Sequence, residues 1–125
     1  NAEVLTARLS MLPALRIPQP GADIYHAYYK YYAYVRPEAL KTDWSRDRII
    51  AEIAEQGIFC GSGSCSEIYR EKAFTSNNLG PAAPLPVARE LGETSLMFLV
   101  HPTLTEAQLS RHAEIIATVV EAATR

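Results

Sequence analysis

The sequence feature that most constrains the fold is residues 24–36, which hold six of the chain's seven tyrosines and contain neither glycine nor proline. Aromatic enrichment without breaks favours a β-strand, and Pro37 ends it. Both faces of this strand carry large side chains. We therefore expect helices to cover one face and a neighbouring domain to cover the other. Alternation predicts one face with Tyr25, Ala27, Tyr29, Tyr31, Ala33 and Val35, and another with His26, Tyr28, Lys30, Tyr32 and Tyr34.

Two more strands and four helices are predicted around this strand. Short apolar runs predict strands that start at Ile58 and span residues 95–100. Apolar residues three and four apart predict helices over residues 3–12, 45–56, 86–91 and 105–121. Ser45 and a Thr105–Gln108 capping box start two of them, and Gly57 and Gly92 end two. The order predicts an α+β fold, with a small three-stranded, mainly antiparallel sheet and helices packed mainly on one face.

Composition narrows the class of protein. The 125 residues are 48% hydrophobic and 21% charged, as in one globular domain. A formal charge of −2 offers no basic surface to nucleic acid, and no apolar run approaches the roughly 18 residues of a membrane span. Two cysteines disfavour a disulfide scaffold and fit the reducing cytoplasm. A start without methionine and a Pro- and Gly-rich connector at residues 18–21 predict a piece of a larger protein.

The stretch most typical of a functional site is residues 57–74, GIFCGSGSCSEIYREKAF. A short apolar strand leads into six small residues, 61–66, and such loops on rigid strands commonly carry sites. The Gly-x-Gly start is like a dinucleotide-binding fingerprint, but Ser66 replaces the third glycine. A backbone nest that contacts phosphate or sugar stays open as an alternative. Glu67 and Tyr69 could orient a ligand or bond the loop to itself.

No residue of this chain is predicted to act in catalysis or to bind a metal. Cys60 and Cys65 with three scattered histidines do not make a zinc site, and the loop offers a thiol no base. Cys60 is expected to pack inside its strand. Lys30 could form a Schiff base if desolvated, but a stem that covers tyrosine rings is the simpler interpretation. His26 and His101 are interpreted as structural, His101 as a turn anchor.

Three segments resemble the C-terminal domain of the DegT/DnrJ/StrS family of PLP-dependent sugar aminotransferases. They are HAYYKYYAYVRPE at 26–38, the loop stretch at 57–74 and LPVARELGETSLMFLVHPTLT at 85–105. The resemblance implies a fold type I enzyme, in which a large domain holds PLP and the C-terminal domain closes over the active site. It also implies a homodimer that moves an amino group from glutamate to a nucleotide-linked keto sugar, for polysaccharide or antibiotic-sugar biosynthesis.

The same resemblance implies how the chain is divided and where its site lies. Residues 1–21 would be a leading helix and linker from a missing N-terminal large domain, and residues 22–125 the C-terminal small domain. The family's PLP lysine and other cofactor-binding residues lie in the large domain, so this chain alone is expected to hold no PLP and to be inactive. Substrate contacts are expected from Ser62, Ser64, Glu67 and Tyr69, in a loop exposed to solvent when the large domain is absent. Many members have a His-Tyr pair where this chain has residues 62–66.

Two other functions stay open from the sequence. The chain could be a free-standing small-molecule-binding module, as its small-residue loop would allow, or a dimerisation module that uses the tyrosine-rich strand as an interface. Replacing the loop serines in the full-length parent separates these functions, because a site role predicts lost turnover and an interface role a lost dimer.

Overall fold

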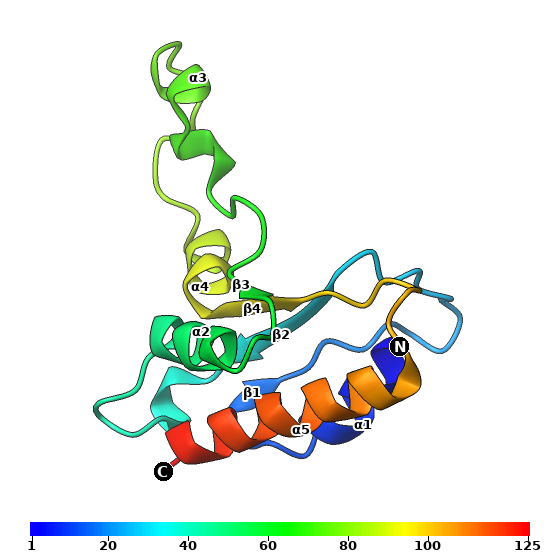
Figure 1. Cartoon of the computed structure of the whole chain (residues 1–125). Coiled ribbons are helices and arrows are strands. Elements are labelled where there is room, and N and C mark those ends of the chain that lie inside the picture. Colours follow the sequence, from blue (N-terminus) through cyan, green and yellow to red (C-terminus); the bar gives the residue numbers. More distant parts are fainter.

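A four-stranded sheet is the centre of the computed structural model, which describes residues 1–125 (Figure 1). The strands are β1 (Leu15–Arg16), β2 (Tyr31–Val35), β3 (Cys60–Gly61) and β4 (Ser95–Phe98), in the order β1-β2-β4-β3. All neighbours pair antiparallel, and the β2–β4 register places Tyr31 opposite Phe98 and Ala33 opposite Leu96. The fold is thus α+β, as predicted, and the tyrosine-rich strand lies next to the strand that begins at Ser95.

The sheet has four strands, not the three that the sequence predicts. The additional strand, β1, lies in the connector that follows Pro13. Leu15 pairs with Val35, and the Arg36 N–H donates to the Ala14 carbonyl at 2.8 Å. Two residues are too few for alternation to mark a strand, so the pattern gave no signal for β1.

The tyrosine-rich strand is shorter than predicted, because residues 24–30 are irregular. Tyr28 has a φ of 47°, and its N–H donates to His26 Nδ1 at 2.9 Å. A positive φ is unusual for an aromatic residue and interrupts the extended backbone. Of the face predicted to carry Tyr25, Ala27, Tyr29, Tyr31, Ala33 and Val35, only the last three are buried, along β2, whereas Tyr25 and Tyr29 are exposed.

Four helices surround the sheet. They are α1 (Ala2–Leu9), α2 (Arg46–Glu55), α4 (Pro86–Thr94) and α5 (Glu106–Ala123), with a single turn α3 (Lys72–Thr75) and the 3-10 turns η1 (Pro37–Ala39) and η2 (Ile68–Arg70). Both predicted N-caps are confirmed: Ser45 Oγ accepts from the Arg48 N–H, and Thr105 and Gln108 form a capping box. Gly92 was predicted to follow its helix, but it lies inside α4.

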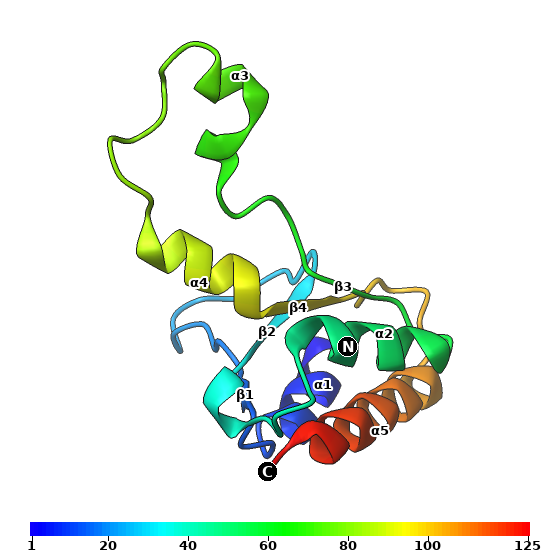
Figure 2. The ribbon, with the colours of Figure 1, turned by 90° about the vertical axis from the view of Figure 1, so that its left-hand side faces the viewer.

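One hydrophobic core lies between the sheet and α1, α2 and α5, and α4 lies on the opposite face (Figures 1 and 2). Leu5 and Leu9 of α1, Ile53 of α2, and Ile116 and Val120 of α5 are all at most 1% exposed. Residues before position 21 thus supply both a helix and a strand to this core. The predicted division at residue 21 concerns a larger protein and stays a prediction.

An arm, residues 62–85, projects from the body between β3 and α4 (Figures 1 and 2). It carries η2 and α3, and none of its residues is fully buried. At its root Ser66 lies against Gly92 of α4. A Cβ added at Gly92 would collide with Ser66 Oγ and would lie 2.8 Å from Ser66 Cβ. This contact explains why a residue that weakens helices stands inside α4.

Replacing Gly92 with alanine should therefore fail to stabilise the protein. A Gly→Ala change inside a helix normally adds about 1 kcal/mol to the free energy of unfolding. In G92A the new methyl group must displace Ser66, so we expect no gain or a loss in urea denaturation. The double variant G92A/S66G should recover the gain relative to S66G alone. A full gain in G92A by itself would contradict the contact.

Candidate functional site

The predicted site loop forms the root of the arm and is open to solvent, which confirms the expected exposure. Ser62, Ser64, Cys65 and Ser66 are all exposed. The hydroxyl groups of Ser62 and Ser64 are therefore free to meet a ligand. Each can donate one hydrogen bond and accept others, which suits a ligand rich in hydroxyl or phosphate oxygens.

The backbone of this root is fixed on the sheet although its side chains are exposed. Ser95 Oγ of β4 donates to the Ser62 carbonyl at 2.5 Å. Gly63 has a φ of 89°, and a Cβ at this position would lie 2.6 Å from Cε1 of Tyr32. Only glycine allows this approach to the Tyr32 ring on β2. The two serines therefore start from a rigid point of the fold.

Glu67 and Tyr69 bond to each other, so the structure shows the second of the two alternatives left open for them. The Tyr69 hydroxyl donates to Glu67 Oε1 at 2.6 Å, and an Arg70 guanidinium N–H donates to Oε2 at 3.2 Å. The Tyr69 hydrogen bond, helped by Arg70, lowers the pKa of Glu67, and the same bond raises the pKa of Tyr69. Glu67 thus presents an ionised carboxylate within the arm at neutral pH.

Neither thiol is suited to nucleophilic chemistry. Burial in β3 raises the pKa of Cys60 to about 12, which confirms that this side chain packs in the strand. Cys65 is exposed, and its hydrogen bond to Glu71 at 3.3 Å raises its pKa. Because the thiolate is the reactive form, both shifts disfavour nucleophilic chemistry near neutral pH. In residues 1–125, no three His, Cys, Asp or Glu side chains lie close enough together to bind a metal ion. No helix is both long and apolar enough to cross a membrane.

The three lysines do not fit a PLP site. Such a site needs a neutral lysine amine beside the cofactor's aldehyde and groups that hold its phosphate. Lys41 Nζ instead donates to the Ala122 carbonyl at 2.7 Å, and Lys72 is exposed on α3. Lys30 Nζ lies 5.4 Å from the centre of the Tyr29 ring, so the ammonium group itself, and not only the predicted stem, lies beside tyrosine. No step of PLP chemistry can be derived from the residues of this chain.

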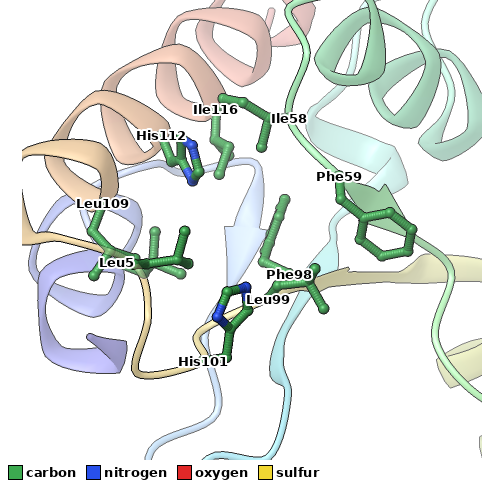
Figure 3. A pocket seen from close by; sticks show the side chains of 10 residues that line it. Leu5, Ile58, Phe59, Phe98, Leu99, His101, Leu109, His112 and Ile116 are labelled. Atoms are coloured by element: carbon green, nitrogen blue, oxygen red, sulfur yellow. The ribbon is translucent and has the colours of Figure 1, made fainter.

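A small cavity of about 60 Å³ opens beside α1, α5 and the end of β4 (Figure 3). Eight of its ten lining residues are hydrophobic, and His101 and His112 point into it from opposite sides. His101 Nδ1 lies 2.6 Å from Thr103 Oγ1, as expected for a turn anchor. The sequence analysis did not identify His112 as a cavity residue. Its spacing could have shown this, because His112 lies three residues after Leu109 and four before Ile116, two buried residues of α5.

The partly buried His112 should make stability depend on pH. Burial, and to a lesser degree Arg111, lowers its pKa below the usual imidazole value. Near pH 6 the unfolded chain therefore binds more protons than the folded chain. The contribution of His112 to the free energy of unfolding is fully present above the usual imidazole pKa and is lost as the pH falls through that value. Between pH 8 and pH 5 the free energy of unfolding in urea should fall further for the unaltered chain than for H112Q. Equal losses in the two proteins would rule out this role.

Comparison with known proteins places the fold. No family model matches the chain, and no curated protein matches it. Among solved structures, an aminotransferase from Psychrobacter cryohalolentis is 45% identical over 98% of this chain and 33% of its own, with a TM-score of 0.88. A DegT DnrJ EryC1 StrS aminotransferase from Brucella abortus is 20% identical over 94% and 28%, with a TM-score of 0.74. The sugar aminotransferase CalS13 from Micromonospora echinospora is 18% identical over 94% and 28%, with a TM-score of 0.75.

These matches define the class of protein. The chain has the fold of an aminotransferase domain and spans about one third of the length of the structures it matches. Its structural neighbours are aminotransferases of the DegT/DnrJ/StrS type, to which the chain is similar in fold, and this confirms the resemblance seen in residues 26–38, 57–74 and 85–105.

Proposed function

We propose that this chain is the C-terminal domain of a PLP-dependent aminotransferase that moves an amino group from glutamate to a nucleotide-linked keto sugar. The observation that carries the proposal is the 45% identity over 98% of the chain to the Psychrobacter cryohalolentis aminotransferase. The shared fold with CalS13, a sugar aminotransferase, supports a sugar as the acceptor. The parent would serve polysaccharide or related sugar biosynthesis in the cytoplasm.

In this proposal the parent's large domain holds PLP and supplies the catalytic groups, and the parent works as a homodimer. The matched structures are about three times as long as this chain, which leaves room for such a domain. The present domain contributes the arm, which would reach the substrate cleft and close it against water. Its projection from the body supports a partner surface beyond this chain (Figure 2).

The substrate site proposed for this domain consists of Ser62, Ser64, Glu67 and Tyr69, in which the serines and Glu67 would contact the substrate and Tyr69 would hold the Glu67 carboxylate. The two exposed serines offer hydroxyl groups, and Glu67 offers a carboxylate that can accept from sugar hydroxyls. Their role would be to hold and orient the nucleotide sugar over the cofactor.

The serines provide the first test. In the full-length parent, S62A/S64A should lower kcat/KM for the keto sugar roughly thirtyfold, because two hydrogen bonds of ordinary strength are lost. The dimer, measured by sedimentation, should stay intact. Ser110, exposed on α5, gives the matched control S110A, which should not change turnover. Loss of the dimer with turnover per dimer unchanged would favour a dimerisation module instead.

The isolated chain provides the second test. We expect it neither to hold PLP nor to transaminate, because Lys30, Lys41 and Lys72 lack the surroundings of a cofactor lysine. The purified chain is incubated with PLP, reduced with borohydride and mapped for labelled peptides. Scattered, substoichiometric labelling is expected. Stoichiometric labelling of one lysine together with glutamate-dependent turnover would show that this chain is itself the catalyst.

A further inference from the structure

The arm is held in shape by hydrogen bonds rather than by a core. None of residues 62–85 is fully buried, and Ile68, Leu79 and Leu85 are each about half exposed or more. With so little apolar burial, a segment of this kind opens easily unless polar contacts hold it. The contacts that join its two legs therefore decide its conformation.

One hydrogen bond joins the outgoing leg, residues 62–71, to the returning leg, residues 79–85. The Leu85 N–H donates to the Tyr69 hydroxyl at 3.0 Å, between residues 16 positions apart. The legs also approach at Gly80, where an added Cβ would lie 3.5 Å from the Tyr69 carbonyl oxygen. Apart from the Ser95–Ser62 bond at the root and the bond from the Arg89 N–H to the Leu85 carbonyl at the start of α4, the other hydrogen bonds of the arm are local, within one leg or around α3.

The same Tyr69 hydroxyl also holds a carboxylate. It donates to Glu67 Oε1 at 2.6 Å, a short bond of the charge-assisted kind, which is stronger than a neutral one. The Glu67 side chain is only 16% exposed, and the positive charges of Arg70 and Arg89 favour its ionised form. The acceptor is therefore charged at neutral pH, and both hydrogen-bonding roles of the Tyr69 hydroxyl are in use.

We infer that Tyr69 is a positioning residue: through one hydroxyl group it fixes the returning leg at Leu85 and the carboxylate of Glu67, and so sets the conformation in which the arm presents Glu67. Tyr69 then acts on a ligand through other residues, not by direct contact. The effect on substrate binding rests on the proposed function. The closure of the arm, by which we mean the joining of its two legs through Tyr69 and Leu85, does not.

The closure is tested on the chain itself by hydrogen exchange. Y69F keeps the ring and removes the hydroxyl, so the Leu85 amide should exchange roughly fivefold faster or more. Trypsin cleavage at Arg70 and Lys72 should accelerate, while the thermal midpoint stays unchanged because the arm adds nothing to the core. Y25F alters a fully exposed tyrosine outside the arm and is the matched control. Unchanged exchange of the Leu85 amide in Y69F would overturn the inference.

The positioning role is tested in the full-length parent. If Y69F lowers the fraction of arms in the binding conformation, KM for the keto sugar should rise severalfold with little change in kcat. E67A should raise KM as well, and adding Y69F to E67A should raise KM by a smaller factor than Y69F alone does, because the Tyr69–Glu67 contact is already lost in E67A. Faster exchange with an unchanged KM would overturn the positioning role. A parent that does not aminate keto sugars would refute the proposed function, and the exchange result would still decide the closure.

Discussion

The pairing of β2 with β4 is the constraint on which the rest of the structure depends. It places Tyr31 opposite Phe98 and Ala33 opposite Leu96, so one face of the two central strands is apolar except for the Tyr31 hydroxyl. That face can be removed from water only by the stripes of α1, α2 and α5, which fixes where these helices lie. The Tyr31 hydroxyl, which would be costly to bury alone, is satisfied by Thr6 of α1 at 2.9 Å. Register and helix position are therefore specified together.

The core is stabilised by hydrophobic burial, whereas the arm is stabilised by hydrogen bonds. The body buries a continuous cluster of aliphatic and aromatic side chains, whose loss of contact with water stabilises it roughly in proportion to area. The arm has no such cluster and depends on a few directional bonds near Glu67 and on the fit of Ser66 against Gly92. Its conformation can therefore change without cost to the core, which is the property a segment needs if it is to meet a partner surface.

The sequence predicted those features that depend on local chemistry. Helix starts at Ser45 and Thr105 were correct because a cap needs only a side chain and the next three residues. The exposure of the small-residue loop was expected from the family resemblance, and the burial of Cys60 from its place in a short apolar strand. Features set by contacts between distant segments were wrong or missed: β1 exists only because Val35 pairs with it, and α4 passes through Gly92 only because Ser66 lies beside it. For the site, spacing alone could not show that Glu67 and Tyr69 bond to each other.

The two edges of the sheet have a consequence for how copies of this fold can associate. Both edge strands, β1 and β3, are only two residues long. A foreign strand that approached either edge would find almost no row of free N–H and carbonyl groups with which to continue the sheet. An assembly that includes this domain is therefore expected to form through side-chain surfaces. Because both edge strands are so short, the sheet is also a poor template for growth into fibres.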